Sequence, residues 1–98
     1  MKITIYYRKN LKMSNGKLGA VCAHIGNQLG VQYPSQPCAT DIKIVVLMMS
    51  DKKYFETLES IKNDGYIYHE HVDNGLTEVD ERTSCAFGFI GELQNGWF

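Results

Sequence analysis

The residues best suited to chemistry lie in a basic segment that leads into a predicted helix. Residues 8–17 read RKNLKMSNGK and LGAVCAH follows directly, so Lys17 stands at the start of the helix and His24 two turns further on. The first turn of a helix has unpaired N–H groups and a partial positive charge, which favour anions. We therefore expect Lys17 to bind a phosphate or to stabilise a developing oxyanion. A solvated lysine at a helix end is the plain structural alternative.

The charges of the chain are unevenly distributed along it. The formal net charge is only −1, yet residues 1–40 contain five basic residues and no Asp or Glu, and all eleven acidic residues lie in residues 41–98. Such polarity predicts a face that meets an anion, either a nucleic acid or a nucleotide. The alternative is that the two halves interleave in the fold, so that the asymmetry averages out.

Length and composition are typical of one small globular domain spanning residues 1–98, with 44% hydrophobic and 21% charged residues. A strand pattern begins at Lys2, so we expect no signal peptide, and no apolar run is long enough to cross a bilayer. Cys22, Cys38 and Cys85 form no CxxC pair. Free thiols of this kind favour a reducing, cytoplasmic setting.

The hydrophobic pattern predicts an α/β domain of three layers, in which helices pack on a four-stranded mixed sheet with the order β-α-β-α-β-β. Strands are expected at about 2–7, 42–49, 66–72 and 85–90, and helices at about 16–29 and 51–64. Ser14 and Ser50 are expected to cap the two helices, and Gly65 to end the second. Residues 30–41 hold both prolines and read as an irregular loop.

Two details of this pattern concern burial. Residues 42–49 are almost continuously apolar, which is typical of a strand buried on both faces of a parallel sheet. In the second helix, Phe55, Leu58 and Ile61 are expected to face the sheet. Ligands of open α/β sheets lie beyond the carboxyl ends of the strands. The loops at 8–17 and 73–83 both follow such ends, so we expect them to share one cleft.

Two separated motifs carry a resemblance to a known family. The first motif is matched by Arg8, Leu11, Lys12, Met13, Gly16, Lys17, Ala20, Ala23 and His24, and the second by Asp73, Gly75 and Thr77. In both, the chain resembles the peptidyl-tRNA hydrolases of the archaeal and eukaryotic type over residues 2–91. These enzymes cleave the ester that joins a peptide to the terminal ribose of tRNA. The resemblance therefore implies an α/β hydrolase that acts on tRNA.

The resemblance also implies which residues act. Lys17, Asp73 and Thr77 take the positions to which the family's catalysis is attributed. Asp73 would orient or deprotonate a water, Thr77 would hold it, and Lys17 would stabilise the oxyanion. The positions expected to contact the substrate are Arg8, Asn10, Lys12, Asn15, His24 and Thr83. No cofactor is expected.

Other chemistry-bearing residues have simpler interpretations. His69 and His71 share one face of the third strand, but no further ligands at metal spacing accompany them, so we interpret them as a polar strand face. His24 is interpreted as a supporting residue, because it lies about 10 Å from Lys17 along the helix axis. Its place on a face of small residues favours a hydrogen-bonded packing histidine over a functional one.

Several positions depart from the family pattern. Asn10, Asn15 and Val21 replace an aspartate, a lysine and a glutamine of the first motif, and Cys85 falls where the family has a second threonine. Residues 92–98 stand where the family has a closing helix. Trp97 and Phe98 in this segment are expected to cover exposed core or to form a homodimer contact.

These departures favour a second hypothesis of another class. With fewer basic residues and altered cleft positions, the same scaffold would bind a nucleotide or another phosphorylated small ligand without cleaving it. A phage could use such a minimal chain against host defence by sequestering a nucleotide signal. The sequence alone leaves the hydrolase and the binder both open.

Overall fold

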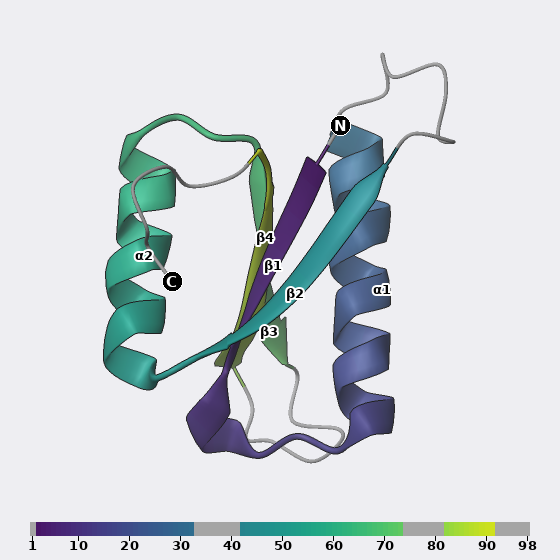
Figure 1. The fold of residues 1–98 in the computed structure, drawn as a ribbon, viewed down its shortest axis with the longest axis vertical. Helices are drawn as coiled ribbons and strands as arrows, with labels where there is room; N and C mark the ends of the chain where they lie inside the picture. Colours follow the sequence, from purple (N-terminus) through teal and green to yellow (C-terminus); the bar gives the residue numbers. More distant parts are fainter. Residues whose placement is uncertain (1, 33–41, 74–81, 92–98) are drawn as a thin grey trace.

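The computed structural model describes residues 2–32, 42–73 and 82–91. They form a four-stranded mixed sheet flanked by two long helices (Figure 1). The strands are β1 (Lys2–Arg8), β2 (Lys43–Met49), β3 (Tyr68–Asp73) and β4 (Thr83–Ile90), and the helices are α1 (Asn15–Gln32), α2 (Asp51–Asn63) and the short 3-10 helix η1 (Lys9–Leu11). The predicted fold class and element order are confirmed.

The sheet has the strand order β2-β1-β4-β3. β1 pairs with β2 in parallel and with β4 antiparallel, and β3 pairs antiparallel with β4. It follows that β1, β2 and β3 all run the same way and end at one edge of the sheet. Both long helices and β4 begin at this carboxyl edge.

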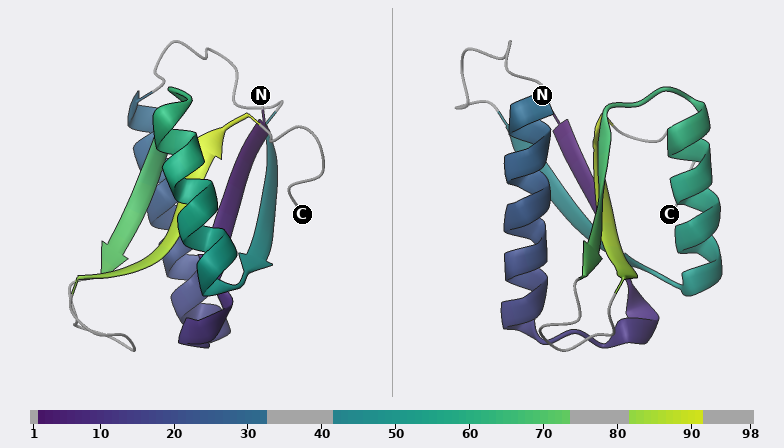
Figure 2. Two further views of the ribbon diagram at one scale, coloured as in Figure 1. Left: turned by 90° about the vertical axis from the view of Figure 1, so that its left-hand side faces the viewer. Right: turned by 180° about the vertical axis from the view of Figure 1, so that it is seen from behind.

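The two helices cover opposite faces of the sheet (Figure 2). α1 buries Val21, Ile25 and Leu29 against the face that carries Ile3 and Ile5 of β1. α2 buries Tyr54, Leu58 and Ile61 against the other face. The sheet residues of that second core are Tyr6, Met49, Phe87 and Phe89. Alternation of side chains along β1 thus supplies both cores, because successive residues of a strand point to opposite faces.

Local signals define the helix ends as predicted. The Ser14 hydroxyl accepts a hydrogen bond from the Lys17 N–H at 3.2 Å, and the Ser50 side chain accepts one from Lys53 N–H. Such caps satisfy N–H groups that the first helical turn leaves unpaired. Gly65 follows α2 with a φ of 77°, a left-handed conformation that suits glycine. α1 is longer than predicted and continues to Gln32.

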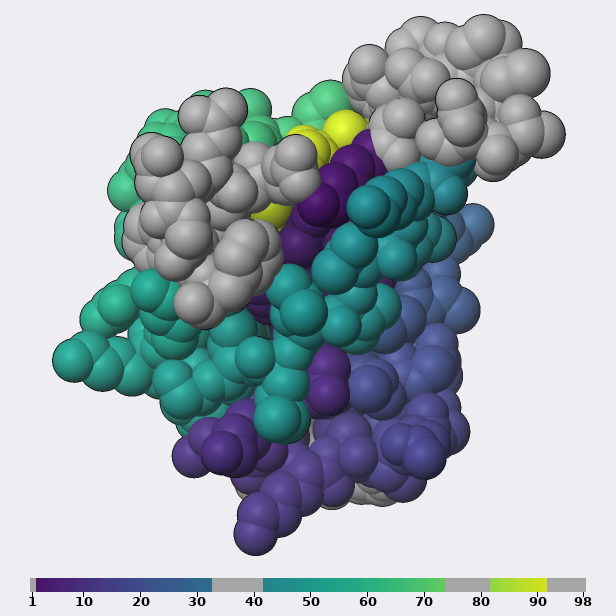
Figure 3. All heavy atoms as spheres, viewed as in Figure 1, coloured from purple at the N-terminus to yellow at the C-terminus, as the bar shows by residue number. Residues whose placement is uncertain are grey.

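The prediction that residues 42–49 are buried on both faces is wrong. β2 lies at the edge of the sheet, and Ile44, Val46 and Met48 are 56%, 40% and 54% exposed. Figure 3 shows β2 at the surface of the molecule. These three residues pair in register with Ile3, Ile5 and Tyr7 of β1, so they lie on the α1 face. α1 packs toward β4 and β3 instead, so within the described residues neither long helix covers this part of the face.

The prediction that Phe55 faces the core is also wrong. Phe55 is 46% exposed, whereas its neighbour Tyr54 is completely buried and packs beside Phe87. Leu58 and Ile61 are buried as predicted. The apolar stripe of α2 therefore begins at Tyr54, whose hydroxyl bonds to Ser84 Oγ of β4 at 2.7 Å. Tyr54, Leu58 and Ile61 follow the i, i+4, i+7 spacing of one helix face, and the buried tyrosine hydroxyl has a hydrogen-bond partner.

Candidate active site

The first turns of α1 and the end of β3 meet at the carboxyl edge of the sheet. There the Lys17 ammonium donates a hydrogen bond to Asp73 Oδ2, in an ion pair between residues 56 positions apart. The two side chains are only 10% and 5% exposed. The Ser14 cap fixes the backbone of Lys17, and β3 ends at Asp73. Lys17 and Asp73, which belong to the two segments expected to share a cleft, are therefore in direct contact.

The backbone around Asp73 is held by the start of β4. The Arg82 N–H donates to the Asp73 carbonyl oxygen at 2.5 Å, and Asp73 pairs in register with Thr83. Arg82 has a φ of 61°, so the chain enters β4 through a left-handed residue. Thr83, predicted to contact the substrate, therefore lies beside Asp73 in the sheet.

Cys85 lies beneath the ion pair on the α1 face of β4. Its side chain is completely buried, and the thiol donates to the Thr83 carbonyl oxygen at 3.4 Å. Burial raises the pKa of the Cys85 thiol, with a smaller contribution of the same sign from the Asp73 charge. The thiol is therefore protonated at neutral pH. A nucleophilic cysteine needs the thiolate, so Cys85 acts here as a small core residue.

Two histidines stack along the seam between α1 and β3. The rings of His24 and His71 have centroids 5.4 Å apart and an angle of 25° between their planes. Burial lowers the pKa of His71, and the nearby His24 and Lys17 lower it further. His71 is therefore neutral at pH 7. His69, one step further along the same face, also has a pKa lowered by its burial.

Arg8 belongs to a separate cluster at the same edge. Its Nε and Nη2 donate to the two carboxylate oxygens of Asp51 at 3.0 and 2.6 Å, and its Nη1 donates to the Ser84 carbonyl oxygen at 3.0 Å. The guanidinium also lies over the Phe55 ring, 5.1 Å from its centroid. These contacts connect β1, α2 and β4. Arg8, predicted to contact the substrate, is thus placed in a structural junction.

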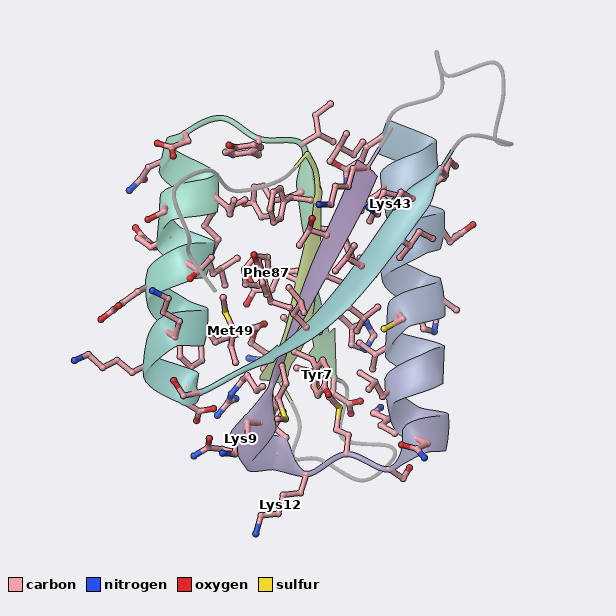
Figure 4. All side chains as sticks on the ribbon, viewed as in Figure 1. Tyr7, Lys9, Lys12, Lys43, Met49 and Phe87 are labelled. Carbon is pink, nitrogen blue, oxygen red and sulfur yellow. The ribbon has the colours of Figure 1, made fainter. Side chains whose placement is uncertain are left out.

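The remaining predicted contact residues lie on the outside of the 8–17 segment. Asn10, Lys12 and Asn15 are exposed, and Lys12 takes a left-handed backbone conformation after η1. Figure 4 shows Lys12 pointing away from the molecule. The structure does not bring them together with Lys17 and Asp73. Thr77, Trp97 and Phe98 lie outside the described residues.

The partners of two site residues, His71 and Arg8, were not predicted from the sequence. The sequence pattern placed His71 on one face of its strand but did not pair it with His24, and it left Asp51 and Tyr54 without roles. One signal for the place of His71 was available, because His71 and Asp73 are two residues apart on a strand and so share one of its faces. Within the described residues, no group of three or more His, Cys, Asp or Glu side chains is placed to hold a metal ion. No helix of that part of the chain is long and apolar enough to span a membrane.

The class that fold and site define is a small α/β protein with a buried lysine–aspartate pair at the carboxyl edge of its sheet. Comparison with family models gives no match, and comparison with curated proteins gives no significant one.

Proposed function

We propose that this protein hydrolyses the ester between a peptide and the terminal ribose of tRNA. The observation that carries the proposal is the Lys17–Asp73 pair, which joins the two motifs that carry the resemblance to peptidyl-tRNA hydrolases. Ester hydrolysis needs a proton acceptor for water and a positive charge near the carbonyl oxygen. A carboxylate and an ammonium group in contact, at the edge where ligands of α/β sheets bind, supply both.

In the proposed reaction, Asp73 transfers the proton and Lys17 stabilises the negative charge. Asp73 accepts a proton from water as its oxygen bonds to the ester carbonyl carbon. The Lys17 ammonium and the N-terminal turn of α1 stabilise the resulting oxyanion. The carbon–oxygen bond to the ribose then breaks, and the ribose oxygen takes the proton held by Asp73. Thr77 remains a predicted ligand of the water.

The test is hydrolysis of a defined N-acetylaminoacyl-tRNA by the purified protein. Removal of a general base typically lowers the rate about 10²–10⁴-fold, so Asp73→Asn should lose most of the turnover. Lys17→Met should do the same. Asp64→Asn is the matched control, because Asp64 is an exposed aspartate that follows the last residue of α2, at the end of the helix away from the Lys17–Asp73 pair. Equal turnover in Asp73→Asn and Asp64→Asn would contradict the proposal.

A second candidate function is nucleotide binding without cleavage. The observation that favours it is the pairing of Arg8 with Asp51 and of Lys17 with Asp73. Because these two positive charges are matched within the protein, less positive charge is left to bind the many phosphates of a whole tRNA. A nucleotide that co-purifies with the protein and raises its melting temperature, with no ester turnover, would favour this binder over the hydrolase.

A further inference from the structure

We propose that His24 and His71 form a stacking platform for an unpaired base, that of the nucleotide whose ribose carries the ester. The inference deepens the proposed function, on which its choice of ligand rests. Its basis is the position of the stacked rings beside the Lys17–Asp73 pair, on the same two elements.

The distance between the two features suits a single nucleotide. Lys17 and His24 are seven residues apart on α1, which places them on one stripe of the helix about 10 Å apart along its axis. On β3, across the seam from α1, Asp73 follows His71 by two residues. The stacked rings and the ion pair therefore lie in line along the α1–β3 seam. An ester at the ion pair would leave its own base close to the rings.

The ring pair has the properties of a base-stacking site. Single-stranded RNA is recognised by stacking of its bases on aromatic side chains, histidine among them. His24 is exposed, so its ring is not part of the core. His71 lies beneath it, and its lowered pKa keeps that ring uncharged. A neutral imidazole stacked under an exposed one extends the surface on which a further ring can stack.

Small residues border the α1 surface between the two features. Ala20 is three residues after Lys17 and four before His24, so it borders the stripe that joins them, and it is exposed. Its methyl group projects little. Gly16, one turn earlier on the same side, has no atom within 4 Å of where a Cβ would stand. A larger side chain at Ala20 should therefore obstruct the ligand.

The test uses a short single-stranded RNA with fluorescent 2-aminopurine at its 3′ end, because stacking quenches this base. We expect quenching by the intact protein and by His24→Phe, which keeps an aromatic ring. His24→Ala and His71→Ala should bind roughly tenfold more weakly. Ala20→Leu should also weaken binding. Ala23→Leu is its matched control, since Ala23 is exposed and lies about 60° further round the helix.

Kinetics on N-acetylaminoacyl-tRNA separate this inference from the proposed function. His24→Ala should raise KM with kcat unchanged, whereas Asp73→Asn should lower kcat and keep RNA binding. Quenching that depends on His24 without any turnover would overturn the hydrolase and keep the platform. Turnover that depends on Asp73 but not on His24 would do the reverse. The platform is also overturned if His24→Phe, at an unchanged melting temperature, binds as weakly as His24→Ala.

Discussion

Lys17 and Asp73 form a buried ion pair across 56 residues of sequence, between the first turns of α1 and the end of β3. The pair brings together the two sequence motifs and, at the same time, ties α1 to an edge strand of the sheet. Its residues are therefore expected to matter for stability as well as for activity.

Lys17→Met should destabilise the fold strongly. It would leave the Asp73 carboxylate, 5% exposed, without its charged partner, and loss of one partner of a buried pair typically costs about 3–5 kcal/mol. Lys17→Met combined with Asp73→Asn should be less destabilised than the sum of the single variants, because neither charge is then left alone. Urea unfolding of the four proteins measures this coupling. Strictly additive free energies would show that the pair contributes nothing beyond its separate residues.

The sequence predicted helices and strands better than it predicted the order of the strands in the sheet. Hydrophobic patterns identified the two long helices and the four strands of the described residues, because alternation, the 3.6-residue repeat and a continuous apolar run are properties of neighbouring residues. Whether residues 42–49 lie at the centre or the edge of the sheet depends on strand order, which periodicity does not contain. The exposed Ile44, Val46 and Met48 are the consequence. The same holds for Phe55, whose burial was misjudged because Ser84 and Arg8 were not yet placed nearby.

The same limit applies to the candidate site: contacts that depend on how the elements pack together could not be predicted. Lys17 and Asp73 could be predicted to lie near one another, since Lys17 follows β1 and Asp73 ends β3, and these strands run in one direction. The His24–His71 stack could not, because it requires that α1 pack over β3 and not over β2. Arg8 was expected at the substrate, yet three of its nitrogen atoms already have partners in β4 and α2. Charge alone does not tell a binding residue from a structural one.

Arg8→Ala should lower the free energy of unfolding by about 1–3 kcal/mol. Bidentate arginine–carboxylate bonds are among the stronger charge-assisted hydrogen bonds, and the Arg8 side chain also packs on Phe55. Arg8→Lys should recover little, because lysine lacks the planar fork. Chemical unfolding compares these variants with Lys12→Ala, which removes an exposed cation of the same segment. A loss as small as that of Lys12→Ala would mean that the junction is dispensable.

Stability should fall as the pH falls through the ordinary histidine range. The pKa of His71 is lowered in the folded state, by burial first and then by His24 and Lys17, with Asp73 acting in the opposite direction. The unfolded chain therefore binds more protons, and the unfolding free energy decreases below the ordinary value of about 6.5. The depressed pKa of Asp51 acts only below 3.8, so the two effects are separate. His71→Asn should flatten the profile of melting temperature between pH 8 and pH 5.

The pH control uses the second histidine of the strand. His69 also has a lowered pKa because of burial, with Glu70 opposing this effect and His24 adding to it. His69→Asn should therefore remove part of the slope, and the double variant with His71→Asn should remove most of it. A slope that persists unchanged in the double variant would assign the acid sensitivity to other groups.

The exposed stripe on β2 should promote self-association at high protein concentration. An edge strand with apolar side chains in solvent is a common start of strand-to-strand aggregation, and charged residues there suppress it. Val46→Lys should therefore raise the solubility limit. It should change the unfolding free energy little, since Val46 is 40% exposed. Light scattering over a concentration series checks this, and an equal onset in both proteins would exclude the stripe as the cause.

Gly88→Ala should destabilise the fold by about 1–3 kcal/mol, because β4 and α1 touch at this glycine. A Cβ at position 88 would stand 2.5 Å from the Ile25 Cγ2 atom and 3.1 Å from Ile5. Ile25→Leu removes the Cγ2 branch, so the double variant should recover part of the loss. Gly19→Ala is the matched control: that site has no atom within 4 Å, and alanine in a helix interior gains up to about 1 kcal/mol. Thermal unfolding of the four proteins decides the matter. A Gly88→Ala protein as stable as the parent would contradict the close contact between Gly88 and the Ile25 side chain.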